Sequence, residues 1–202
     1  GVFVERDTPD FRIGERDRTM GLRGIPEGRL HFDGCRVPRE HVLVGPPDGF
    51  KKLMQAYNGQ RLGAATVALG LAQGGYELAL AYAGTRRQFG RAIGDFQGIR
   101  WKLADMAIKL DAARLLIHRA AANAGTGFPD ALEAAKAKTF AAEIAQEVTG
   151  QALQIHGAAG YGRALPLERM ARDARMFAIG GGTVEMMRNL IADRLLPTRA
   201  DF

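Results

Sequence analysis

The sequence contains no serine and only one cysteine, Cys35, and these shortages exclude several kinds of chemistry. Without serine there is no serine nucleophile. A single cysteine can form neither an internal disulfide nor a metal site built from several thiolates. This cysteine usage is typical of a reducing compartment, and we predict a cytoplasmic protein.

Long apolar runs and metal-ligand patterns are missing as well. No hydrophobic stretch approaches the ~18 residues of a membrane-spanning helix, so we expect no membrane segment. The four histidines are scattered, and no two of them have the spacing of zinc ligands on a helix. We therefore predict that the chain holds no metal.

Positive charge is in excess, with 28 Lys and Arg residues against 22 Asp and Glu residues and a net charge of +6. A nucleic-acid-binding protein would combine a basic stripe with exposed aromatic residues. Here the arginines are spread along the chain, and several stand beside glycine-rich turns, where they suit the phosphates of a small ligand. We predict no nucleic-acid partner, and a solvated basic surface is the alternative explanation for many arginines.

The first 47 residues have the composition of β structure with turns. Val2–Val4 and Arg29–Phe32 resemble strands, and glycines and prolines separate them. These strands are too few to make a sheet of their own. We therefore expect residues 1–47 to be the end of a truncated β domain, and a first residue other than Met supports a piece of a longer chain.

Residues 48–202 are predicted to form a second, helical domain that begins at Asp48, a candidate N-cap. Helices are predicted over about 49–84, 95–124, 129–156 and 183–196. The second carries a heptad seam of apolar residues: Phe96, Ile99, Leu103, Met106, Leu110, Ala113 and Ile117. The third presents an apolar face: Phe140, Ile144, Val148, Ala152 and Ile155. This pattern predicts a mainly α fold, an up-down four-helix bundle preceded by the last strands of a β domain.

Four segments carry a more specific signal than the bundle. They are RRQFGRAI at 86–93 with FQ at 96–97, QIHGAAGYG at 154–162, PLER at 166–169 leading into RDAR at 172–175, and GTVE at 182–185. In this order and spacing, with MGLRG at 20–24 and FDGCRVP at 32–38, they resemble the acyl-CoA dehydrogenase family over essentially the whole chain. That family combines an N-terminal helical domain, a middle β domain and a C-terminal four-helix bundle. The resemblance implies FAD as cofactor, an acyl-CoA substrate and a homotetramer with FAD at the subunit interface. It also implies electron-transfer flavoprotein as a possible partner.

The resemblance implies roles for residues on both sides of the second helix's start. Arg86 and Gln88 match positions that hold the FAD pyrophosphate from the neighbouring subunit, and a guanidinium suits a pyrophosphate dianion. Phe89 matches a residue packed beside the cofactor. Phe96 and Gln97 fall at positions on the adenosine side.

Further cofactor positions lie near the end of the chain. Gln154, Gly157 and Ala158 match a turn that approaches the partner's ADP moiety, and Ala158 replaces the family's usual glycine. Thr183 and Glu185 match positions that contact the flavin, where a glycine-rich turn opens a helix whose N–H groups favour anions. Each of these residues, considered alone, is also compatible with a cap, a turn or a salt bridge.

The catalytic base of the family is missing. Dehydrogenation needs a carboxylate to remove the α-proton of the acyl-CoA thioester. The two positions from which family members supply it are occupied by Gly181 and Gln60. Asn58 and Arg61 match positions that contact the substrate.

Three functions therefore stay open from the sequence. The first is α,β-dehydrogenation with a base from elsewhere. The second is non-oxidative chemistry like that of the 3-sulfinopropanoyl-CoA desulfinases, family members that resemble this chain in lacking the glutamate, since elimination of sulfite needs no net oxidation. The third is a non-catalytic oligomerisation subunit, although the retained flavin-contacting residues argue against it. We expect the isolated 202 residues to bind FAD poorly and to be inactive.

Overall fold

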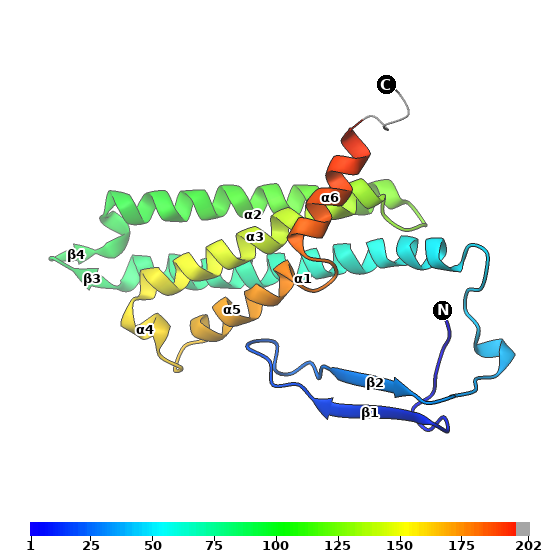
Figure 1. Ribbon diagram of the computed structural model, residues 1–202. Coiled ribbons are helices and arrows are strands. Elements are labelled where there is room, and N and C mark those ends of the chain that lie inside the picture. The colour runs from blue at the N-terminus through cyan, green and yellow to red at the C-terminus, as the bar shows by residue number, and fades with distance from the viewer. Residues whose placement is uncertain (197–202) are drawn as a thin grey trace.

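The computed structural model describes residues 1–196, in which a bundle of long helices lies beside a small β-hairpin (Figure 1). Three long helices run alongside one another: α1 (Gly49–Thr85), α2 (Gln97–Ala124) and α3 (Ala131–His156). Three shorter ones follow: α4 (Ala158–Tyr161), α5 (Leu167–Ala174) and α6 (Val184–Leu195). The predicted mainly α fold is confirmed. Residues 197–202 of the predicted helical domain lie outside the described residues.

Small side chains bring α1 close to α3. Ala65, Ala68, Ala72 and Ala79 are all buried along one face of α1. A methyl group added at Gly75 would lie 3.6 Å from side-chain atoms of α3, so the two backbones approach closely here. Asp48 is the N-cap residue of α1 as predicted, but its side chain makes no capping hydrogen bond.

The heptad seam predicted for α2 forms the contact with the rest of the bundle. Met106, Leu110, Ala113 and Ile117 are buried, while Phe96, Ile99 and Leu103 pack partly buried against the same core. Helix α3 lies at the centre and contacts α1, α2, α5 and α6. Asp130 caps α3 by accepting hydrogen bonds from the backbone N–H groups of Leu132 and Glu133.

The β region differs from the prediction in one strand. Strand β1 (Phe11–Arg16) pairs antiparallel with β2 (Gly28–Phe32), which covers the predicted Arg29–Phe32. The prediction of a strand at Val2–Val4 is wrong: only a single bridge joins Val2 to Val42. The segment opposite Val2–Val4 includes a 3₁₀ turn at Arg39–His41, whose helical backbone cannot continue a ladder.

None of the helices among residues 1–196 is both long and apolar enough to span a bilayer. The same residues contain no group of three or more His, Cys, Asp or Glu side chains placed to hold a metal ion.

Candidate functional site

The residues matched to cofactor and substrate, together with the base position Gly181, fall into two groups. The first, the hairpin site, consists of Arg86, Gln88, Phe89, Phe96, Gln97, Gln154, Gly157 and Ala158. The second, the turn site, consists of Asn58, Arg61, Gly181, Thr183 and Glu185. Figure 1 shows the hairpin site at the far end of the bundle, where the β3–β4 hairpin and α4 lie, while the turn site lies between α1, α3 and α6.

The hairpin site is built around a two-residue turn. Strands β3 (Arg87–Gln88) and β4 (Arg91–Ala92) pair antiparallel, and Phe89 and Gly90 between them have φ values of +50° and +78°. Positive φ at both positions is what a type I′ hairpin requires. At Phe89 this backbone costs about 1–2 kcal/mol relative to a glycine. The sequence did not predict this hairpin, because the strands are only two residues long.

Phe89 is strained and also exposed. The residue is 91% accessible, and its ring meets the Phe96 ring edge-on, with ring centroids 6.1 Å apart. The Arg91 guanidinium lies 4.3 Å from the centroid of the Phe96 ring. A large apolar side chain held out of the fold on a strained turn is placed to contact another molecule.

The ends of three helices meet at the hairpin site. Tyr82 of α1 stacks on the buried His156 of α3 with ring centroids 4.2 Å apart. Lys102 of α2 donates to Gln151 of α3 over 2.6 Å. Gly157 ends α3 with φ +58°, so the chain turns sharply into α4. The exposed residues that result are Arg86, Gln88, Gln97, Gln154, Gly157 and Ala158. Their amide and guanidinium donors suit a phosphate-bearing ligand.

The turn site is held by hydrogen bonds from α1. Arg61 donates through Nη1 to the Oδ1 atom of Asn58 over 2.9 Å, and through Nε to the carbonyl oxygen of Gly181 over 3.3 Å. Asn58 is buried and Arg61 is half-buried. Arg61 and Gly181, which are 120 positions apart in the chain, therefore lie together with Asn58, as the resemblance implied for one site.

Thr183 and Glu185 open α6 directly after this turn. The Thr183 hydroxyl accepts a hydrogen bond from the Met186 N–H and caps the helix. Glu185 is exposed, and hydrogen bonds from its own backbone N–H and from the Thr183 hydroxyl lower the pKa of its carboxyl. A carboxylate with a lowered pKa is a weak base, so Glu185 is poorly suited to replace the missing one.

Neither family base position offers a carboxylate or a ready place for one. Gly181 has φ +75°, a conformation that other residues adopt only at a cost. Gln60 is exposed on α1, whereas Asn58 and Arg61 turn toward the bundle. The turn site thus brings together residues that the resemblance matched to substrate and flavin, and neither position matched to the base, Gly181 or Gln60, holds a carboxylate.

Two clefts adjoin Arg61. One, of about 770 Å³, lies between the start of α1, the start of α3 and α6, and is lined by Phe50, Met54 and Lys51 among others. The other, of about 340 Å³, borders Gly182 and α6, and Arg61 and Arg194 line both. Apolar side chains with cations at the rim suit a ligand that has an aliphatic arm and phosphate groups. The sequence did not single out Phe50, Met54, Lys51 or Arg194.

One ligand cannot reach both sites on a single chain. Arg61 lies within α1 and Arg86 is the residue that caps its end, 25 positions later, which corresponds to about 38 Å at ~1.5 Å per residue. An extended dinucleotide is shorter than this. The two groups therefore belong to one cofactor only if a second copy of the chain supplies one of them.

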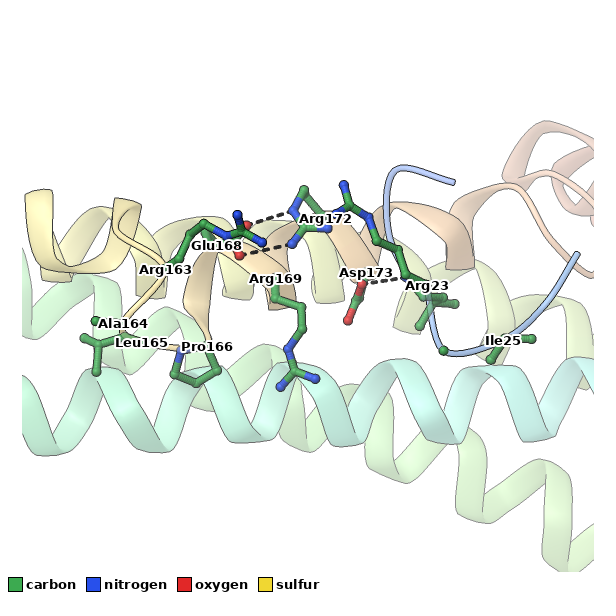
Figure 2. Close-up of a pocket in the computed structure, with 12 residues that line it drawn as sticks. Arg23, Ile25, Arg163, Ala164, Leu165, Pro166, Glu168, Arg169, Arg172 and Asp173 are labelled. Carbon is green, nitrogen blue, oxygen red and sulfur yellow. Dashed lines mark hydrogen bonds and ion pairs between the residues drawn. The ribbon is translucent and has the colours of Figure 1, made fainter. Parts of the chain in front are cut away.

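A third cleft, of about 700 Å³, lies where residues 22–25 meet α5 (Figure 2). Arg172 donates to both carboxylate oxygens of Glu168 and to the Met20 carbonyl, and Asp173 accepts from the Leu22 N–H over 2.6 Å. A methyl group at Gly21 would lie 2.6 Å from the Arg172 carbonyl oxygen, so only glycine fits. The motifs at 20–24 and 172–175 thus join the β region to the bundle.

Comparisons with known proteins agree on one family. A family model described as "Acyl-CoA dehydrogenase, C-terminal domain" matches residues 47–196. A 3-sulfinopropanoyl-CoA desulfinase of Paraburkholderia xenovorans is 56% identical over 96% of this chain and 50% of its own. The butyryl-CoA dehydrogenase structure from Megasphaera elsdenii superposes with a TM-score of 0.93 at 37% identity, over 97% of this chain and 51% of that one. A structure described as PigA with FAD and proline gives a TM-score of 0.91 at 25% identity, over 96% and 51% of the two chains. The chain spans about half the length of the curated relatives it matches.

Proposed function

Because the chain belongs to the acyl-CoA dehydrogenase family, as its sequence predicted, we propose that it is part of a flavoprotein that binds FAD and an acyl-CoA. We further propose that its reaction is non-oxidative cleavage of the carbon–sulfur bond of a 3-sulfinopropanoyl-CoA-like thioester. The observation that carries this proposal is the occupation of both base positions by Gly181 and Gln60, while Asn58, Arg61 and Gly181 still form one site.

The hairpin site and the turn site are the proposed FAD contacts. Arg86 and Gln88 would bind the pyrophosphate, Phe89 would pack beside the cofactor, and Gln154, Gly157 and Ala158 would approach the ADP moiety of the partner's FAD. Phe96 and Gln97 would lie on the adenosine side, and Thr183 and Glu185 beside the flavin. When bound in a dehydrogenase of this family, FAD supplies a hydride acceptor.

The clefts beside Arg61 are the proposed acyl-CoA site. Phe50 and Met54 offer an apolar wall for an aliphatic arm, and Lys51 and Arg194 stand where phosphates could be neutralised. Asn58 and Arg61 would contact the thioester end, since Arg61 reaches the turn itself.

Desulfination is balanced without an electron acceptor. The bond between the β-carbon and sulfur breaks, the carbon takes a proton, and the sulfur leaves as sulfite with an oxygen atom from water. The electrons remain within the substrate and its products. No α-proton has to be removed, so the reaction does not need the missing carboxylate. A desulfinase relative at 56% identity, against 37% for the butyryl-CoA dehydrogenase, supports this assignment.

A homo-oligomer completes the proposed cofactor site. Helix α2 exposes Trp101, Ile108 and Leu115 at intervals of seven residues, with 62%, 67% and 69% of each residue accessible. This apolar stripe on an outer face is suited to pack against another copy. We propose the homotetramer that the family resemblance implied, located in the cytoplasm. Electron-transfer flavoprotein would be a partner only if the protein also dehydrogenates.

The proposal is tested on the native polypeptide at its full natural length, loaded with FAD. We expect it to be yellow and to release one sulfite per 3-sulfinopropanoyl-CoA, and Arg61→Ala to weaken acyl-CoA binding. Unchanged acyl-CoA affinity in Arg61→Ala would remove Arg61 from the substrate site. A protein that stays colourless with FAD would instead favour a non-catalytic oligomerisation subunit.

A further inference from the structure

The largest fully buried side chain of the described residues is a lysine. Lys138 of α3 is only 1% accessible, and its ammonium donates to the carbonyl oxygen of Gly182. Burial is the main cause that lowers the pKa of Lys138, and the nearby Arg61 cation lowers it further. Buried ammonium groups are expensive for a fold, and an apolar side chain of the same length would be easier to accommodate.

Lys138 and Arg61 donate hydrogen bonds to two successive backbone carbonyls. Arg61, from α1, donates to the carbonyl of Gly181, and Lys138, from α3, donates to the carbonyl of Gly182. Gly181 and Gly182 have φ values of +75° and +97°. Glycines have the widest backbone freedom, so these two residues need outside contacts to keep one conformation.

The orientation of these two carbonyls also determines the orientation of the next two amide N–H groups. In a trans peptide the N–H points opposite to the C=O, so the N–H groups of Gly182 and Thr183 are directed away from the two cations. Thr183 caps α6, and Glu185 is in its first turn. The direction of the Gly182 carbonyl therefore fixes the position of the start of α6, which carries Thr183 and Glu185, the two proposed flavin contacts.

We propose that Lys138 is a positioning residue that clamps the Gly181–Gly182 turn and thereby orients Thr183 and Glu185 toward the flavin. This rests on the proposed function, because it assumes that FAD occupies the turn site. Lys138 does not replace the missing base. Its ammonium is buried behind the turn and bonded to the Gly182 carbonyl, although its Cε atom lies 3.9 Å from a methyl group placed on Gly181.

The test compares Lys138→Met with Thr139→Val in the FAD-loaded native polypeptide. Methionine is one heavy atom shorter than lysine and just as flexible, so it fills most of the same space while it removes the donor and the charge. Thr139 is the next residue of α3, and its hydroxyl is buried without a hydrogen-bond partner among the described residues. Valine there keeps the shape and disturbs neither the turn nor the bundle.

For Lys138→Met we expect a Tm equal to or above that of the wild type, an FAD Kd raised about tenfold, and an altered flavin absorbance spectrum. Thr139→Val should keep the wild-type FAD Kd and spectrum. A Lys138→Met protein with unchanged FAD Kd and spectrum would overturn the proposal. So would a lower Tm with unchanged flavin properties, which is the signature of a merely structural lysine.

If Lys138→Met yields no folded holoenzyme, Lys138→Gln is the variant that tests the proposed clamp. Its amide keeps a donor but is shorter by one atom, so we expect an FAD Kd between those of the wild type and a fully unclamped turn. A wild-type FAD Kd and spectrum in Lys138→Gln would refute the clamp. Wild-type protein that binds no FAD would contradict the proposed function itself, which keeps the two failures distinct.

Discussion

Restoring a carboxylate at Gly181 tests the link between the missing base and the missing oxidation. In Gly181→Glu the new Cβ meets no obstacle, because the nearest atom to an added methyl group is the Lys138 Cε at 3.9 Å, an ordinary van der Waals contact. The backbone is less favourable. At φ +75° a non-glycine residue costs about 1–2 kcal/mol, of which the reduced freedom of the unfolded chain returns about 0.4–1 kcal/mol.

The expected net loss of stability is therefore about 1 kcal/mol, too little to unfold a typical domain. The Lys138 and Arg61 cations close by would hold the pKa of the new carboxyl low, so it should act as a weak base. Even so, a positioned base contributes about 10²–10⁴-fold to proton removal. We expect Gly181→Glu to gain slow reduction of the flavin by a straight-chain acyl-CoA.

The matched control is Gly181→Gln, which carries the same backbone strain and nearly the same volume but cannot accept the proton. The assay is stopped-flow absorbance of the flavin band under anaerobic conditions, with acyl-CoA in excess. Reduction by the glutamate variant should exceed that by the glutamine variant by at least about 100-fold. Equal rates in the two variants, with both folded and both binding acyl-CoA, would show that position 181 does not control oxidation.

Two further perturbations probe the rest of the structure. The hydrogen bond from Arg172 lowers the pKa of Glu168 below its ordinary value of 4.5, so its ion pair stabilises the fold above that pH and is lost as pH falls through the folded-state pKa. Glu168→Gln should therefore lower Tm at pH 7 and flatten the acid side of the Tm–pH curve, whereas an unchanged curve would show that the pair adds no stability. Phe89→Gly should relieve the strained turn and raise Tm slightly while weakening FAD binding. Unchanged FAD affinity would remove Phe89 from the cofactor site.

The long helices could be predicted because their signals are local. The seam through Met106, Leu110 and Ile117 repeats over several turns, and all three residues are buried. The strand prediction at Val2–Val4 was wrong because strand formation is not a local property. Its strand composition is real, but pairing depends on a distant segment whose 3₁₀ turn offers only one bridge, at Val42.

The residues of the candidate site likewise include some that the sequence singled out and some that it did not. The resemblance singled out Asn58 and Arg61, and the structure joins them to Gly181 through hydrogen bonds of Arg61. Lys138 was missed, because a lysine inside an alanine-rich helix has no local signal that distinguishes a buried clamp from a solvated charge. Its role depends on a turn 44 residues away that only folding brings to it. The Phe89 turn was missed because two-residue strands lie below what periodicity can detect.

The most direct test of the central claim is an anaerobic titration of the FAD-loaded native polypeptide with straight-chain and branched acyl-CoAs, following the flavin absorbance band. With Gly181 and Gln60 at the base positions, we predict a band that shifts as the acyl-CoA binds and never bleaches. Bleaching would mean that hydride reaches the flavin, that a base exists elsewhere, and that the protein is a dehydrogenase after all.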